Sequence, residues 1–151
     1  LPPPSKRGDV FRQAALKALD TLSRNPDGFF LMIEGSNIDK AAHSNNLEEM
    51  MEELLDFDRT AGAVLDWASK HPGTLVVITA DHNTGAFALT GGSREKGEIT
   101  ARFGSGSHDG VAVPVYAFGA GSGAFTGIYE NTAIFSKIMD AFKKGAGKPV
   151  R

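Results

Sequence analysis

Apolar side chains recur at intervals of three and four residues in three parts of the chain, a spacing that places them on one face of a helix. The intervals predict amphipathic helices over residues 9–24, 47–70 and 131–143. Asp9 and Asn131 are good N-cap residues for the first and the last of these helices. Turn-forming sequences at 25–28 and 71–73 are expected to end the first two.

Shorter apolar runs without helical spacing predict strands. The run at 29–33 shows no alternation, which is typical of a strand buried on both faces, and 74–80 and 111–119 are further candidates. Because a long helix separates the first two runs, their order predicts a right-handed βαβ unit. The expected fold class is therefore α/β with parallel strands. Residues 87–90 and 99–103 flank a glycine-rich segment and predict a hairpin.

The polar faces of these helices carry no obvious site. Glutamates at 48, 49, 52 and 53 lie near the start of the long helix, where its dipole favours negative charge, and we interpret them as a solvated face. His71 follows the same helix and is interpreted as a cation at its carboxyl end.

Composition narrows the classes of function. A hydrophobic share of 41% in 151 residues is ordinary for a globular domain, and a net charge of −2 gives no electrostatic case for nucleic acid. No apolar run approaches the roughly 20 residues of a membrane helix. The chain has no cysteine, so any metal must be bound by His, Asp and Glu.

The two ends of the chain are expected to lie outside the folded part. The sequence begins with leucine and three prolines, which favour an extended segment. We therefore expect a linker-like start at 1–8, one domain at 9–144, a frayed tail at 145–151, and further sequence upstream in the parent protein.

A first group of candidate metal ligands follows the run at 29–33. Glu34 comes directly after it, and Asp39 and His43 are four residues apart, which places them on one face of a short helix. The alternative is that Glu34 caps this helix and that the other two form a solvated pair.

A second group lies in loops at the ends of other predicted strands. Asp81 and His82 follow the strand at 74–80, and His108 lies in the loop that leads into the strand at 111–119. Ligand sites of open α/β sheets gather at such strand ends. Imidazole and carboxylate ligands suggest zinc, and Glu34 is an oxygen donor suited to magnesium. So many ligands favour a site with several metals that acts in phosphoryl transfer, although loop histidines are often merely exposed.

Three segments of the sequence resemble the C-terminal portion of alkaline phosphatases. They are GFFLMIEGSNIDKAAH from residue 28, VVITADHNTGAFALTG from residue 76 and HDGVAVPVYAFGAGSGAFTGIYENTAIF from residue 108. The segments occur in the family's order with compatible spacing, and three motifs in register are more specific than any one alone.

The resemblance implies a three-layer α/β/α fold with a mostly parallel central sheet, and a phosphate monoester hydrolase that is usually a dimer and periplasmic or extracellular. It implies one zinc ion held by Asp39, His43 and His108, and a second held by Asp81 and His82. By the same resemblance Glu34 would bind magnesium. Lys40 would help to hold phosphate, or is simply an exposed lysine.

The family's serine nucleophile, its metal-bridging aspartate and its phosphate-binding arginine belong to the N-terminal half, and none is found here. The resemblance thus implies a fragment that needs the N-terminal portion of the same protein and is nearly inactive alone. Ala86 stands where a glycine is usual, and Asp109 where a threonine is common. The alternatives are a phosphoglycerate mutase or sulfatase-like enzyme of the same superfamily, or a non-catalytic metal-binding module.

Overall fold

A computed structural model of the protein describes residues 2–145. Of the tail predicted at 145–151, residue 145 instead ends the last helix, and residues 146–151 lie outside the described residues. The helices are α1 (Pro4–Arg7), α2 (Val10–Leu22), α3 (Ser36–His43), α4 (Leu47–Ser69) and α5 (Ala133–Gly145), with a 3₁₀ turn η1 (Ser122–Phe125). The strands are β1 (Leu75–Thr79), β2 (Asn83–Thr84), β3 (Ala88–Ser93), β4 (Glu98–Arg102), β5 (His108–Asp109) and β6 (Val115–Gly119).

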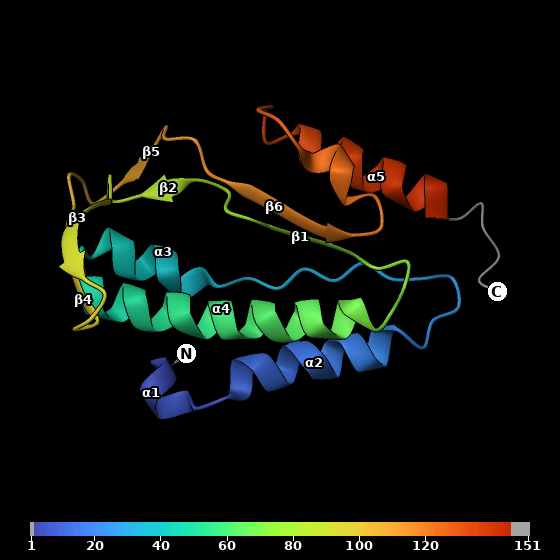
Figure 1. Ribbon diagram of the computed structural model, residues 1–151, viewed down its shortest axis with the longest axis horizontal. Helices are drawn as coiled ribbons and strands as arrows, with labels where there is room; N and C mark the ends of the chain where they lie inside the picture. Colours follow the sequence, from blue (N-terminus) through green and yellow to red (C-terminus); the bar gives the residue numbers. More distant parts are fainter. Residues whose placement is uncertain (1, 146–151) are drawn as a thin grey trace.

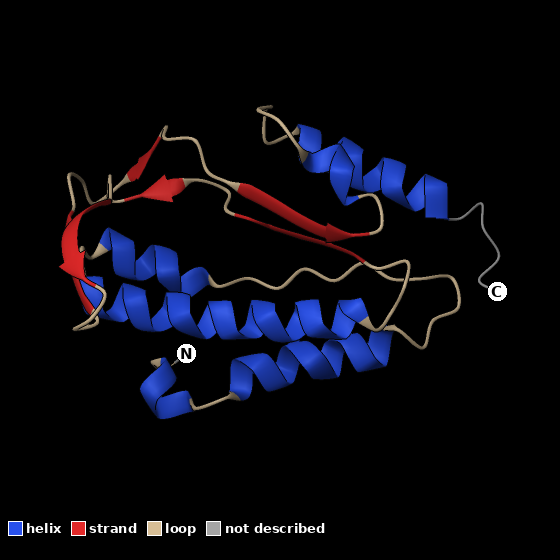
Figure 2. Ribbon diagram, in the orientation of Figure 1, coloured by secondary structure: helices blue, strands red, loops and turns tan. Residues whose placement is uncertain are grey.

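The elements lie in layers (Figures 1 and 2). Helices α2 and α4 pack together on one side, the β1–β6 pair lies in the middle, and α5 covers the opposite side. The helices predicted from apolar spacing are confirmed as α2, α4 and α5, because their periodicity is a local property that survives in the packed chain. Asn46 caps α4 by accepting from the Glu49 backbone N–H.

The segment 29–33 is not a strand, which corrects the prediction. It runs extended along α4, as Figure 1 shows, with Phe29 against the ring of Trp67. Alternate side chains face solvent, and Phe30 and Met32 are 62% and 75% exposed. An apolar run favours extended backbone, but a strand also needs a neighbour, and no strand of the described residues pairs with this segment.

The predicted parallel βαβ unit is therefore also wrong. Strand β1 pairs with β6 in antiparallel register, with Val77 opposite Ala117. The strands of the described chain form three antiparallel pairs, β1–β6, β2–β5 and β3–β4. The β3–β4 pair confirms the predicted hairpin and contains an irregularity between Leu89 and Gly91.

The start of the chain is not the extended linker that its prolines suggest. Pro4 opens the short helix α1, where proline is tolerated because the first helical N–H needs no partner. Arg7 at its end donates to Glu53 and Asp56 on α4. Glu53 is thus a buried ion-pair partner, which corrects its assignment to a solvated face.

The core of the described residues is small and lies under α3. Ala41 and Ala42 pack against Met50 of α4, with partly buried Ile38, Leu47, Phe87 and Phe103 around them. Gly35 lets the chain approach α4, because a Cβ there would lie 2.7 Å from the ring of Phe57. This packing fixes α3, and with it two of the candidate ligands, against α4.

Candidate metal centre

Three of the predicted ligands converge at one end of the molecule. Asp39 and His43 lie on successive turns of α3, and His108 begins β5, so the chain brings together side chains up to 69 residues apart. The three candidate ligand atoms lie within 4.8 Å of one another. Among the described residues this is the one such group of three or more acidic, histidine or cysteine side chains.

The hydrogen bonds of His43 direct one ring nitrogen into the group. Its Nδ1 lies 2.7 Å from the carbonyl oxygen of Gly106, which can only accept, so Nδ1 carries the proton. The lone pair of the neutral ring is then on Nε2, which faces Nε2 of His108 at 3.0 Å. This arrangement is common in metal-binding histidines, whose second nitrogen donates to a carbonyl or carboxylate.

The distances between the donors fit a single metal ion. The Asp39 oxygens lie 3.5 Å from His43 Nε2 and 3.6 Å from His108 Nε2. Ligand atoms of one tetrahedral zinc ion, each about 2.0–2.1 Å from the metal, are separated by roughly 3.4 Å. Two imidazole nitrogens and a carboxylate oxygen are also a ligand set that zinc prefers. The residues present therefore fit a zinc ion.

Asp81 and His82 form a second, smaller group beside the first. His82 Nε2 lies 3.2 Å from Asp81 Oδ2, and the His82 ring stacks on His108 with a centroid separation of 3.5 Å. Two ligands leave a tetrahedral ion incomplete, so this pair needs donors from elsewhere.

The structure does not bring Glu34 or Lys40 into the group of three. Glu34 is exposed at the end of the unpaired segment. Lys40 is exposed on α3, with Nζ 3.5 Å from Asn37 Oδ1. Their assigned roles remain predictions.

The loop after β2 is held in place by backbone contacts to the loop before β5. Gly85 has a positive φ of 81°, and a Cβ there would lie 2.9 Å from the ring of Phe103 and 3.1 Å from the Ala42 carbonyl. Its N–H donates to Ser107, and its carbonyl accepts from Gly104 and Ser105. Only glycine fits this position without strain, and these bonds bring His108 next to α3.

Asp109 fixes the same loops from the other side. Its carboxylate accepts from the Val111 N–H, the Asn83 side chain and the Ala86 N–H. The backbone hydrogen bond from Val111, helped by those from Asn83 and Ala86, holds the pKa of Asp109 below its usual value. The Asp109 carboxylate thus ties the two loops together through hydrogen bonds, at a position where the resembling family often has threonine.

The sequence reasoning missed Thr84, whose hydroxyl donates to Asp39 Oδ1 at 2.6 Å and lies 3.1 Å from His82 Nδ1. The available signal was its position two residues after His82, since residues two apart in an extended chain share a face.

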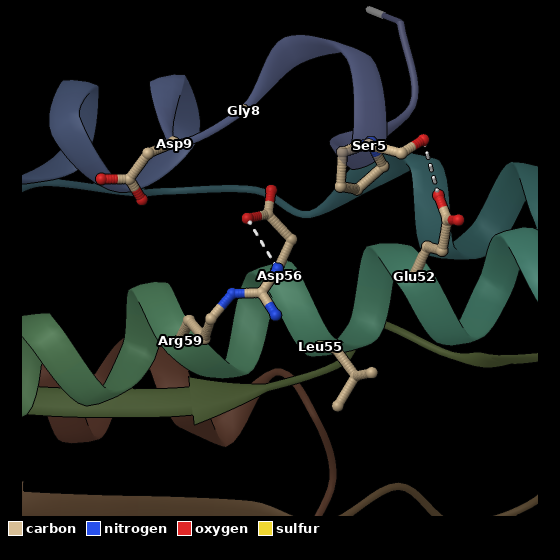
Figure 3. A pocket seen from close by; sticks show the side chains of 8 residues that line it. Ser5, Gly8, Asp9, Glu52, Leu55, Asp56 and Arg59 are labelled. Atoms are coloured by element: carbon tan, nitrogen blue, oxygen red, sulfur yellow. Dashed lines mark hydrogen bonds and ion pairs between the residues drawn. The ribbon is translucent and has the colours of Figure 1, made fainter.

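A hollow elsewhere on the surface contains none of the proposed ligands. It has a volume of about 350 Å³ and lies between α1 and α4. Figure 3 shows Ser5 beside Glu52 and Arg59 beside Asp56 at its wall. The candidate metal ligands therefore lie outside this hollow.

No helix within the described residues is both long and apolar enough to cross a membrane.

The comparisons with known proteins agree with the geometry. The sequence profile of the alkaline phosphatase family matches residues 8–102. Streptomycin-6-phosphate phosphatase of Streptomyces griseus is 35% identical over 131 residues, which are 76% of this chain and 29% of that protein. An alkaline phosphatase of Escherichia coli is 30% identical over 93% of this chain and 34% of its own length.

Solved structures show the same relationship in three dimensions. The alkaline phosphatase from the Antarctic bacterium TAB5 is similar over 95% of this chain, with a TM-score of 0.87 and 39% identity. A variant of it, solved with Mg bound in its M3 site, gives a TM-score of 0.83 at 39% identity over 91% of this chain. The chain covers 44% and 42% of these structures, less than half of either. The chain belongs to the alkaline phosphatase family.

Proposed function

We propose that the whole protein hydrolyses phosphate monoesters through a phosphoserine intermediate, and that this chain supplies most of its metal ligands but no nucleophile. The observation that carries the proposal is the convergence of Asp39, His43 and His108 from two distant segments. The relative named for streptomycin 6-phosphate supports phosphate esters as the substrate class.

In this proposal Asp39, His43 and His108 hold one zinc ion, and the Gly106 carbonyl orients the ring of His43. Asp81 and His82 contribute to a second zinc site that residues from outside the chain complete. Bound zinc ions supply Lewis acidity toward phosphate oxygens and activate the attacking oxygen.

Glu34 is proposed as a magnesium ligand and Lys40 as a phosphate contact. Glu34 lies in the segment before α3 and Lys40 lies on α3, and both side chains are exposed. Residues from another part of the protein can therefore reach them. The relative solved with bound Mg supports a magnesium site in the proposal.

The N-terminal portion of the same protein is the proposed partner of this chain. The unpaired segment 29–33 presents Phe30 and Met32 to solvent, and the described residues bury no large side chain completely. Exposed apolar surface of this kind marks an interface. We propose that residues 9–144 join this N-terminal portion in a three-layer α/β/α domain, in which the segment 29–33 becomes a strand of a mostly parallel sheet. We also propose that the whole protein is a homodimer. Its proposed location is the periplasm or the outside of the cell.

The test is hydrolysis by the whole parent protein. We expect hydrolysis of an aryl phosphate, little hydrolysis of the matching aryl sulfate, and loss of activity after chelation that added zinc and magnesium restore. The isolated 151-residue chain should be nearly inactive. Preference for the sulfate would indicate a sulfatase-like enzyme, and metal binding without hydrolysis of either ester would indicate a non-catalytic module. Either result would overturn the proposal.

A further inference from the structure

Thr84 is a buried polar residue at the junction of the two ligand groups. It is 7% exposed, and its hydroxyl contacts Asp39 of the first group and His82 of the second. In the β2–β5 pair, Thr84 also lies directly opposite His108. One residue therefore touches or faces three of the proposed ligands.

The chemistry of these contacts fixes where the protons lie. A threonine hydroxyl has a single hydrogen, and an ionised carboxylate can only accept. The short contact of 2.6 Å therefore places the hydroxyl hydrogen toward Asp39 Oδ1. Toward His82 Nδ1, 3.1 Å away, the same oxygen can only accept, so Nδ1 must carry a hydrogen.

This assignment decides which nitrogen of His82 can bind a metal. A neutral imidazole with its hydrogen on Nδ1 has its lone pair on Nε2. That lone pair faces Asp81 Oδ2 at 3.2 Å, another acceptor. A proton on Nε2 or a bound metal ion would satisfy both atoms, and with the proton on Nδ1 the Nε2 lone pair is free to bind a metal.

We propose that Thr84 is a positioning residue that holds His82 in the Nδ1–H tautomer and fixes the Asp39 carboxylate, so that one hydroxyl couples the two metal-binding groups. The inference rests on the proposed function in taking Asp39 and His82 as metal ligands. Partners of this kind typically change metal affinity by about 10–100-fold when they are removed. Loss of the Thr84 hydroxyl should therefore weaken both groups together.

The decisive variants are Thr84→Val, which keeps the shape but removes the hydroxyl, and Thr84→Ser, which keeps the hydroxyl. Thr100→Val, at an exposed position of β4, controls for the loss of a threonine elsewhere. The first readout is nitrogen NMR of the chain labelled with ¹⁵N-histidine, without metal and in mildly alkaline solution. The His82 signals are identified by their loss in His82→Ala.

We expect His82 to carry its hydrogen on Nδ1 in the unchanged chain, in Thr84→Ser and in Thr100→Val. In Thr84→Val the hydrogen should move toward Nε2, where it can be donated to Asp81. The same tautomer in Thr84→Val as in the unchanged chain would overturn the proposal, and so would a failure of Thr84→Ser to keep the Nδ1–H form.

Zinc titration of the same variants is the second readout. We expect Thr84→Val to weaken binding about 10–100-fold and Thr84→Ser to retain most of it. Equal affinities in Thr84→Val and the unchanged chain would overturn the proposed coupling. If the unchanged chain binds no zinc but shows the tautomer change, the proposed metal site fails while the role of Thr84 in setting the His82 tautomer stands.

Discussion

Two clusters of charged side chains lie in different parts of the molecule. They differ in whether their carboxylates are paired with hydrogen-bond donors. The cluster of Arg7, Glu53 and Asp56 is closed. Arg7 donates to Glu53 at 2.7 and 2.8 Å and to Asp56 at 2.7 Å, and the three side chains are only 7%, 5% and 4% exposed. Each carboxylate there faces a guanidinium N–H.

The cluster of Asp39, His43 and His108 is open, because its side chains are far more exposed to solvent than those of the closed cluster. Its side chains are 39%, 38% and 50% exposed, and its carboxylate and ring nitrogens face one another across 3.0–3.6 Å. Ring nitrogens and carboxylate oxygens that face one another need a shared proton or a metal ion between them, whereas the carboxylates of the closed cluster already accept from a guanidinium. Burial and charge alone therefore do not distinguish a structural cluster from a candidate metal site, whereas the convergence of unpaired ligand atoms does.

The largest expected effect comes from breaking the closed cluster. Arg7→Ala leaves two buried carboxylates without their partner and should lower the free energy of unfolding by about 3–5 kcal/mol. Urea denaturation followed by circular dichroism measures the loss. Arg12→Ala, which removes an exposed ion pair with Asp9, is the control and should cost less than about 1 kcal/mol. Equal losses in the two variants would show that the Arg7 cluster is not a buried anchor.

A substitution in the open cluster should lower the affinity of the chain for zinc. Asp39→Ala should weaken zinc binding by at least about 100-fold, the upper end of the range for partners that only hydrogen-bond a ligand. Calorimetric titration measures this change. Asp58→Ala, at an exposed position on α4, removes the same charge outside the cluster and should leave zinc affinity unchanged. A loss shared by both variants would indicate a general charge effect instead of a ligand.

A smaller effect is expected at the loop that supports the open cluster. Ala86 has a φ of +44°, a conformation that costs a residue with a Cβ about 1–2 kcal/mol. Ala86→Gly should therefore raise the free energy of unfolding by up to about 1 kcal/mol, since glycine also loses more backbone entropy. Ala88→Gly, in strand β3, should instead be destabilising. A loss of stability in Ala86→Gly would show that this backbone is not strained.

The smallest expected effect is a pH dependence at Asp109. Hydrogen bonds from Val111, Asn83 and Ala86 lower its pKa, so its ionised form stabilises the folded chain. This contribution is present above the unfolded pKa of about 4 and is lost as the pH falls through the lower folded value. Asp109→Asn should flatten the acid side of the melting-temperature profile, while Asp58→Asn should not. An unchanged profile in Asp109→Asn would contradict this role.

Local features of this chain could be predicted from the sequence. The helices α2, α4 and α5 follow from apolar spacing, and α3 brings Asp39 and His43 together because they are four residues apart. Features that depend on distant partners could not. The segment 29–33 reads as a strand, yet whether it pairs depends on a neighbour that its own sequence does not specify.

The same limit explains what was missed at both clusters. The Arg7 side chain reaches carboxylates 46 and 49 residues away, and no local pattern links it to Glu53 and Asp56. Thr84 likewise contacts Asp39 from 45 residues away. The predicted ligands could be named from their places near the ends of predicted strands and from the family resemblance that links their segments, but the residues that hold them could not.

Zinc X-ray absorption of the chain loaded with one equivalent of the metal tests directly whether Asp39, His43 and His108 bind zinc. We expect two imidazole nitrogens and a carboxylate oxygen among the zinc ligands, at about 2.0–2.1 Å from the metal. His108→Ala should reduce the imidazole count by one. A shell of water oxygens alone, or an imidazole count that His108→Ala does not change, would contradict the claim that Asp39, His43 and His108 form a metal site.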